Sequence, residues 1–240
     1  KQFKVLCWIF GQFYYLGLLW WILRLFWFSK FELQKGEKED MNRLEQQMQF
    51  IREMDGLKKI GRQTYLKDAS RKENDAEHSW HLAVMALLLS EYANEKVDVL
   101  RVMSMVLIHD MVELDAGDTY AYDAEGNSTK REREVAAADR IFHLLPEDQA
   151  QYLRGLWEEF EASDTPEAKF AHTLDNVQPI MLNDASDGKA WEELHVKLSQ
   201  VMGRQKVTKK GSEQMWEYAK KNYLDKNIRL GKIQKDIDWE

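Results

Sequence analysis

The sequence VLIHDMVELDAGD, residues 106–118, joins an apolar helix to a cluster of histidine and acidic side chains. Apolar residues recur at steps of three and four before this cluster, which predicts a mostly buried helix over residues 100–112. Moving His, Asp and Glu side chains out of water is costly, and a bound divalent cation offsets that cost. His109 and Asp110 are therefore predicted to be a metal-ligand pair.

The composition predicts one all-α domain with an N-terminal appendage. The chain has 240 residues, of which 44% are hydrophobic and 31% are charged, and it contains only 3 prolines. Residues 41–230 are rich in Ala, Leu, Glu, Lys and Met and have almost no alternating runs of β-branched residues. Both features are typical of helices.

Charge and cysteine content exclude several classes of function. The formal net charge is −7, so the chain lacks the overall positive charge with which proteins bind nucleic-acid polymers. A local basic pocket for one phosphate is still compatible with this charge. Cys7 is the single cysteine, which excludes an internal disulfide framework and a cysteine-based zinc site.

Residues 1–40 differ from the rest of the chain. Residues 5–23 are almost entirely apolar or aromatic and are long enough to cross a bilayer core of about 30 Å. They are either a signal anchor or a stretch outside the working protein, with translation starting at Met41. In an anchor, the excess of Lys and Arg on the C-terminal flank would leave the main domain in the cytoplasm. We expect a cytoplasmic protein, with a membrane-anchored domain on the cytoplasmic side as the alternative.

The polar residues 57–78 are predicted to be irregular and to supply basic side chains. They contain Arg62 and Arg71, whose guanidinium groups match the geometry of phosphate oxygens. The next helix is predicted over residues 78–92. Its first residue, His78, is a candidate metal ligand, and His81, one turn later, competes for that role.

A further buried carboxylate is predicted near the middle of a later helix. Thr165 and Pro166 mark the start of this helix, which continues through FAHTLDNVQPIML, residues 170–182. Asp175 is flanked there by apolar residues and so needs a metal or a basic partner. Pro179 cannot donate to the carbonyl of Asp175, which predicts a kink at that point. Other helices are predicted over residues 41–57, after Asn127, after Pro146, and over residues 191–202 and 213–230.

Two longer motifs resemble the HD-domain phosphohydrolase superfamily, in the branch of bacterial 5'-deoxynucleotidases and the eukaryotic HD-domain-containing protein 2. RKENDAEHS, residues 71–79, is similar to that branch's R-x-E-N-x-x-E-H-S. HDMVELDAGD, residues 109–118, is similar to its H-D-x-x-E-x-x-x-G-D. The resemblance covers about residues 44–220 and implies a single HD-domain helical bundle within residues 41–240.

This resemblance implies one divalent metal ion held by His78, His109, Asp110 and Asp175. Two imidazoles and two carboxylates suit Mn²⁺, Co²⁺, Fe²⁺, Zn²⁺ or Mg²⁺, and geometry rather than sequence decides among them. Such a cation lowers the pKa of a bound water and neutralises phosphoryl oxygens. The predicted reaction is hydrolysis of a phosphomonoester.

The same resemblance implies residues for proton transfer and substrate binding. Glu113 and Asp118 would transfer protons and align the attacking water. Arg62 would orient the phosphate, with Arg71 as a second candidate. The nucleoside pocket would be lined by Asp118, Thr119 and Tyr120.

The chain departs from the deoxynucleotidase pattern beside this arginine. The deoxynucleotidase has a Trp there that screens the sugar 2' position, whereas this chain has Gln63, Thr64 and Tyr65. The loop over residues 117–123 also differs from the proline-containing loop of that enzyme. The preferred sugar and base are therefore left open.

The favoured function is removal of the 5'-phosphate from ribo- or deoxyribonucleoside monophosphates, and alternatives remain. The first alternative is hydrolysis of a phosphodiester or of guanosine tetraphosphate. Alarmone hydrolases carry consecutive acidic residues after His-Asp, whereas this chain has only Glu113 at those places. The second is a non-catalytic nucleotide-binding module tethered to the membrane. The amphipathic helices could also supply a homodimer interface.

Overall fold

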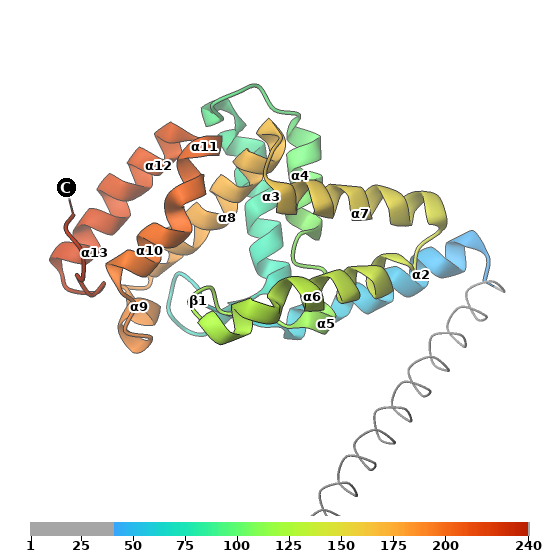
Figure 1. Ribbon diagram of the computed structural model, residues 1–240, viewed down its shortest axis with the longest axis horizontal. Coiled ribbons are helices and arrows are strands. Elements are labelled where there is room, and N and C mark those ends of the chain that lie inside the picture. The colour runs from blue at the N-terminus through green and yellow to red at the C-terminus, as the bar shows by residue number, and fades with distance from the viewer. Residues whose placement is uncertain (1–40, 240) are drawn as a thin grey trace, which may run out of the picture. The chain divides into compact units, whose positions relative to one another are not determined.

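The computed structural model describes residues 41–239 (Figure 1). The chain falls into two compact units, Lys1–Gln47 and Met48–Glu240, and the description below concerns the second. The predictions made for residues 5–23 lie outside the described residues. Among the residues that are described, no helix is long and apolar enough to cross a membrane.

Helices make up most of the described chain, which confirms the predicted all-α class. A single two-stranded antiparallel sheet accompanies them. In chain order the main elements are α2 (Arg43–Met54), β1 (Gly61–Tyr65), β2 (Lys72–Asn74), α3 (Asp75–Leu89), α4 (Val99–Ile108), α5 (Glu113–Ala116), α6 (Ala124–Phe142), α7 (Glu147–Ala162), α8 (Pro166–Ala185), α9 (Lys189–Glu193), α10 (Leu198–Arg204), α11 (Thr208–Gly211), α12 (Glu213–Ala219) and α13 (Asp225–Arg229).

Side-chain caps fix where several of these helices begin. The Thr165 side chain accepts a hydrogen bond from the Ala168 amide and Pro166 occupies the first turn, as predicted for the start of α8. In contrast, α6 begins at Ala124 rather than at Asn127. The carboxylate of Asp123 accepts from the amides of the first turn and so starts this helix earlier.

Part of the stretch that was predicted to be irregular forms the β1–β2 hairpin. Gly61 pairs with Asn74 and Tyr65 with Lys72, with an irregular register between them. The prediction was wrong because the buried positions of these short strands are occupied by polar residues, Thr64 and Glu73, so no apolar alternation marks them. The hairpin leads directly into α3.

The predicted helix over residues 100–112 ends at Ile108. The chain then tightens into turns in which the amides of Met111 and Glu113 donate to the carbonyls of Ile108 and Asp110, at 3.1 and 3.0 Å. The short helix α5 follows and ends at Gly117, whose positive φ of 75° is readily adopted by glycine. These turns change the direction of the chain where His109 and Asp110 are located.

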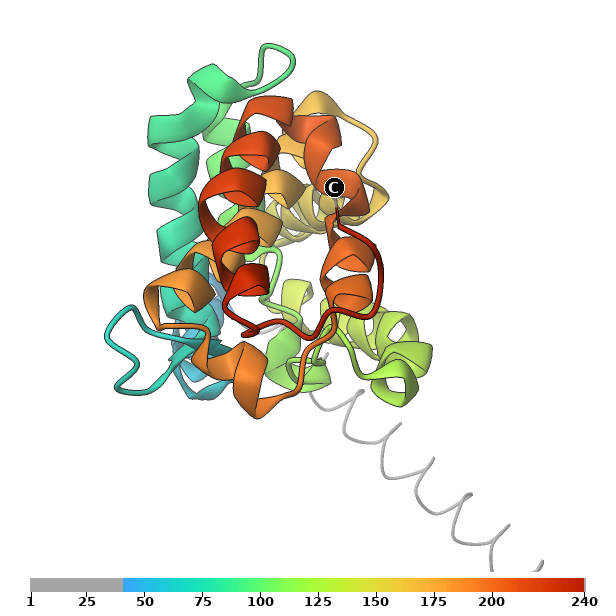
Figure 2. The same cartoon turned by 90° about the vertical axis from the view of Figure 1, so that its left-hand side faces the viewer.

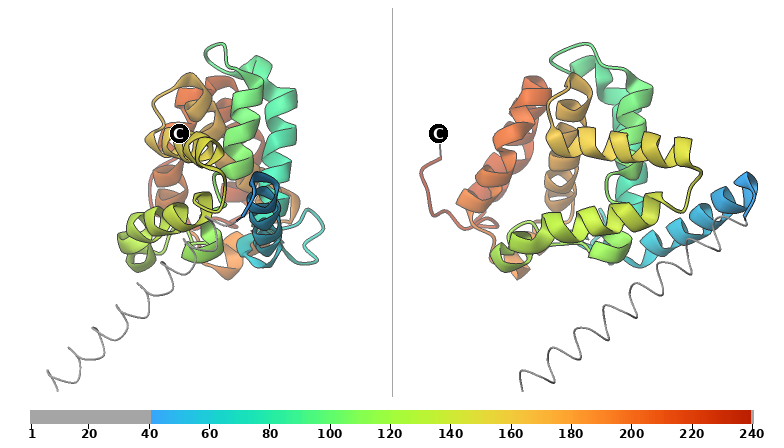
Figure 3. Two further views of the ribbon diagram at one scale, coloured as in Figure 1. Left: turned by 90° about the vertical axis from the view of Figure 1, so that its right-hand side faces the viewer. Right: turned by 45° about the vertical axis from the view of Figure 1, so that its right-hand side comes forward.

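The hydrophobic core has two parts that share α8 and α12. The larger part packs α3, α4, α6, α7 and the first half of α8 around buried residues such as Leu82 and Leu174. Figure 3 shows α3 and α4 side by side. The smaller part gathers Ile180 of α8 and the C-terminal helices, which face the viewer in Figure 2, around residues such as Trp191. Pro179 lies in α8 between the two parts.

The helix predicted over residues 191–202 is divided into α9 and α10. His195 adopts a positive φ of 50° between them, a conformation that no α-helix can include. The helix predicted over residues 213–230 is confirmed as α12 and α13, joined by one π-helical segment at Lys220–Leu224.

Candidate metal and phosphate site

The four predicted metal ligands lie together although they come from α3, from the turn after α4 and from α8. His78 Nε2 is 3.0 Å from Asp175 Oδ1 and 4.0 Å from Asp110 Oδ2. His109 Nε2 is 3.1 Å from Asp110 Oδ1 and 3.9 Å from Asp175 Oδ1. All four residues are buried. The ligand atoms of His78, His109 and Asp110 all lie within 4.8 Å of one another, and Asp175 Oδ1 is close to both histidines.

The protonation of His109 fits a metal site. Its Nδ1 lies 2.9 Å from the carbonyl oxygen of Val106, which can only accept, so Nδ1 carries the hydrogen. Nε2 then faces the two aspartates, where its lone pair would be available to a bound cation. Nε2 is buried and has no hydrogen-bond partner within residues 41–239. A buried nitrogen lone pair beside carboxylates is the arrangement that a divalent cation satisfies.

Arg62 of β1 is held by several carboxylates at this site. Its Nη1 donates to Asp110 Oδ2 at 2.7 Å and lies 3.6 Å from Asp75 Oδ1, while its Nε lies 3.7 Å from Glu73 Oε1. Burial raises the pKa of Asp110, but His109 and Arg62 outweigh burial and hold that pKa well below its usual range. Asp110 is therefore ionised and available as a ligand.

Asp75, Asp110 and Glu113 form a second buried acidic group, whose carboxylate oxygens lie within 4.8 Å of one another. Burial, Asp110 and Asp75 raise the pKa of Glu113 to about 11. Burial and Asp110 raise the pKa of Asp75 to about 7. Without a metal, protons thus remain in this group at neutral pH. The sequence analysis missed Asp75 because it lies in the stretch predicted to be irregular, whereas α3 begins at this residue.

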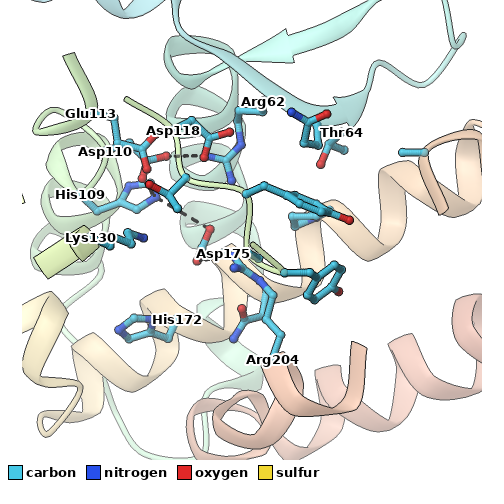
Figure 4. Close-up of a pocket in the computed structure, with 18 of the residues that line it drawn as sticks. Arg62, Thr64, His109, Asp110, Glu113, Asp118, Lys130, His172, Asp175 and Arg204 are labelled. Atoms are coloured by element: carbon cyan, nitrogen blue, oxygen red, sulfur yellow. Dashed lines mark hydrogen bonds and ion pairs between the residues drawn. The ribbon is translucent and has the colours of Figure 1, made fainter. Parts of the chain in front are cut away.

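A cavity of about 330 Å³ lies over the ligands, a size typical of small-molecule sites (Figure 4). In Figure 4, Arg62, Asp110, Glu113 and Asp118 are grouped together, with Asp175 and Arg204 below them. The sequence-predicted residues in the lining are Arg62, His109, Asp110, Glu113, Asp118, Thr119, Tyr120 and Asp175.

Two basic residues in the lining were not predicted. Lys130 of α6 lies 3.3 Å from Glu134. Burial lowers the pKa of Lys130, but Glu134 and Glu113 outweigh burial and raise the pKa above its ordinary value, so Lys130 stays charged. Arg204 of α10 lies 3.3 Å from Asp175 Oδ2. Both positions lie outside the recognised motifs. Only the fold shows that they face the site.

Arg71, the second candidate for phosphate binding, does not line this cavity. Its side chain is 55% exposed and donates to Glu77, with Nη1 at 2.8 Å from Oε2. The same Glu77 accepts from the Asn74 amide in the capping box of α3. Arg71 therefore supports the hairpin and the start of α3.

Residues 54–216 match the HD domain family, and the chain belongs to this family. The predicted resemblance is thus confirmed. A solved relative, a predicted metal-dependent phosphohydrolase from Magnetospirillum magnetotacticum, is 47% identical with a TM-score of 0.76, over 80% of this chain and 95% of that chain. An HD-domain phosphohydrolase from Listeria innocua, at 18% identity and a TM-score of 0.51, shares the fold alone.

Curated relatives include deoxynucleotidases. The human 5'-deoxynucleotidase HDDC2 is 33% identical over 135 residues, which is 56% of this chain and 65% of the human protein. The Schizosaccharomyces pombe 5'-deoxynucleotidase hdd1 is 26% identical over 114 residues, or 46% of this chain and 56% of that protein. This chain thus spans slightly less than two thirds of the length of the human relative.

Proposed function

We propose that the protein is a metal-dependent phosphomonoesterase that removes the 5'-phosphate from nucleoside monophosphates. The observation that carries this proposal is the convergence of His78, His109, Asp110 and Asp175, with separations from 3.0 to 4.0 Å, below a cavity with basic residues in its lining. Membership of the HD domain family and the deoxynucleotidase names of its relatives support the substrate class.

These four residues would hold one divalent ion, which would lower the pKa of a water and neutralise phosphoryl oxygens. The chain's own cations would bind the rest of the phosphate. Arg62 offers a guanidinium fixed by its contact with Asp110, and Lys130 and Arg204 place two further positive charges in the lining. Charged donors of this kind bind phosphate oxygens strongly.

Hydrolysis forms a bond from the water oxygen to phosphorus and breaks the bond from phosphorus to the nucleoside O5'. The water must lose a proton, and the departing O5' must gain one. We assign these transfers to Glu113 and Asp118. Both line the cavity, and burial raises the pKa of each carboxyl. One of the two, ionised, would take the proton from the water, and the other, protonated, would give a proton to O5'.

The test measures phosphate release from a panel of ribo- and deoxyribonucleoside 5'-monophosphates. Protein stripped of metal is re-supplied in turn with Mn²⁺, Co²⁺, Mg²⁺ or Zn²⁺. We expect metal-dependent release that is lost in Asp110→Ala, and the panel reports the sugar preference of a site that has Gln63 and Thr64 in its lining. Asp139→Ala is the matched control, because Asp139 is 61% exposed and pairs with Arg154.

One result of this assay would contradict the proposed function. Protein that binds a metal but releases no phosphate from any member of the panel would contradict it. Phosphodiesters and guanosine tetraphosphate are then the next substrates to assay.

A further inference from the structure

Gln178 of α8 is fully buried between a metal-ligand candidate and an acidic residue of the hairpin. Its Oε1 lies 3.1 Å from His78 Nδ1. Its Nε2 lies 2.9 Å from Glu73 Oε2 and 3.3 Å from His81 Nδ1. Every polar group of this side chain therefore has a partner, although the residue lies outside the motifs that the sequence analysis recognised.

The partners of Gln178 determine which way its amide points. A carboxylate oxygen only accepts hydrogen bonds, so the atom facing Glu73 must be the amide nitrogen. Reversing the amide would place its carbonyl oxygen against that carboxylate and its NH₂ group against His78. The hydrogen-bond network thus assigns the oxygen of Gln178 to His78.

This orientation in turn places a hydrogen on His78 Nδ1. Because Oε1 can only accept, the hydrogen between the two side chains must lie on His78 Nδ1. Glu73 Oε1 is 3.6 Å from the same Nδ1, which is too long for a hydrogen bond, so Gln178 is the direct partner. The opposite nitrogen, Nε2, is hydrogen-bonded to Asp175 Oδ1 at 3.0 Å, so it also carries a hydrogen here, and a bound metal would take the place of that hydrogen.

We propose that Gln178 is a positioning residue that holds a hydrogen of His78 on Nδ1, so that a metal binds at Nε2 in place of the hydrogen shared with Asp175. Glu73 and His81 fix Gln178 by accepting the two hydrogens of its amide nitrogen. His81 is then a support for the site rather than a competing ligand. The inference rests on metal binding by His78, which is part of the proposed function.

The test uses Gln178→Met, which keeps the length of the side chain and removes the acceptor. Metal-free protein is titrated with Co²⁺, and binding is followed by visible absorption. Loss of a partner that orients a ligand weakens metal binding by roughly 10- to 100-fold, and we expect a loss of this size with a changed Co²⁺ spectrum. An unchanged affinity and spectrum would overturn the proposal.

Gln205→Met is the matched control for a buried glutamine. Gln205 is 5% exposed and donates to the Asn176 carbonyl, and none of its hydrogen bonds involves a metal-ligand candidate. We expect this variant to bind Co²⁺ like the unchanged protein, whereas an equal loss of affinity in both variants would reduce Gln178 to an ordinary packing role and overturn the proposal.

A second measurement needs no variant. In the Zn²⁺-loaded protein, ¹⁵N spectroscopy of the histidine side chains should show His78 with a protonated Nδ1 and a metal-bound Nε2. Metal bound at Nδ1, or a chain that binds no metal at all, would overturn the proposal. Protein that shows this tautomer but hydrolyses no nucleotide would contradict the proposed function alone.

Discussion

The folded protein disfavours the charged form of Glu113. Burial beside Asp110 and Asp75 raises its pKa from 4.5 to about 11, so the metal-free folded state keeps a proton that the unfolded chain releases above its ordinary pKa. The contribution of Glu113 to the free energy of unfolding is thus fully present below pH 4.5 and is lost progressively as the pH rises toward 11.

Glu113→Gln should therefore stabilise the metal-free protein under neutral and basic conditions. The amide has no proton to lose, so we expect a higher melting temperature at pH 8 and a weaker decline between pH 5 and 9, with a gain of about 1–3 kcal/mol. Thermal unfolding of both proteins across this range is the measurement. If the melting temperatures of the two proteins fell equally with pH, Glu113 would not be the group that controls this fall.

Replacing Arg204 and replacing Arg71 should have different effects on nucleotide hydrolysis. Arg204→Met should lower kcat/KM for a nucleotide by roughly tenfold or more, because a charged donor to phosphate is lost from the cavity. Arg71→Met should leave it unchanged, since that side chain is exposed and pairs with Glu77. Steady-state kinetics of the two variants decide this, and equal losses would return Arg71 to the site.

At the scale of single residues, the sequence motifs could predict those side chains of the site that occur at a characteristic spacing along the chain. His78, Asp110 and Asp175 could be chosen because each interrupts an apolar pattern. Lys130 and Arg204 could not, because each occurs in a polar stretch that resembles ordinary surface. Their place in the lining depends on how α6 and α10 pack.

Among the elements, α11 packs closely on α8 through Gly211. A Cβ at Gly211 would lie 2.2 Å from the Lys169 carbonyl oxygen and 2.4 Å from Thr173 Oγ1. Gly211→Ala should therefore push the two helices apart and cost about 1–3 kcal/mol. Gly203→Ala is the control, since nothing lies within 4 Å of its Cβ position and alanine favours helix. Urea unfolding of both variants measures the difference, and equal stabilities would contradict this account of the helix contact.

The type of most elements could be predicted, whereas several of their ends could not. Apolar periodicity and the cap at Thr165 predicted long helices such as α8. The end of α4 at Ile108 and the break at His195 depend on local backbone turns that periodicity does not record. The hairpin was missed because polar groups serving the site occupy its buried positions.

For the whole domain, a bound metal would connect α3, the turn after α4, and α8. A ligand that binds only the folded state stabilises it by about 2.7 kcal/mol at a hundred times its Kd. We expect the melting temperature to rise by several degrees as Mn²⁺ or Zn²⁺ is added to the metal-free protein. Asp110→Ala should abolish this rise and Asp139→Ala should retain it, and a rise that persists in Asp110→Ala would place the ion elsewhere.

The division of the core at Pro179 has a consequence for the exchange of backbone hydrogens. Cooperative units of a native protein open separately when few apolar contacts join them. α12 contributes to both parts, with Met215 and Ala219 in the larger core and Trp216 in the C-terminal cluster, whereas the buried residues of α10 belong to the C-terminal cluster alone. Amides of α10 should therefore exchange with deuterium as one group and those of α3 and α4 as another, slower group. Arg204 belongs to the first group and His78 to the second. The two sides of the cavity would thus differ in how often their backbone hydrogen bonds open.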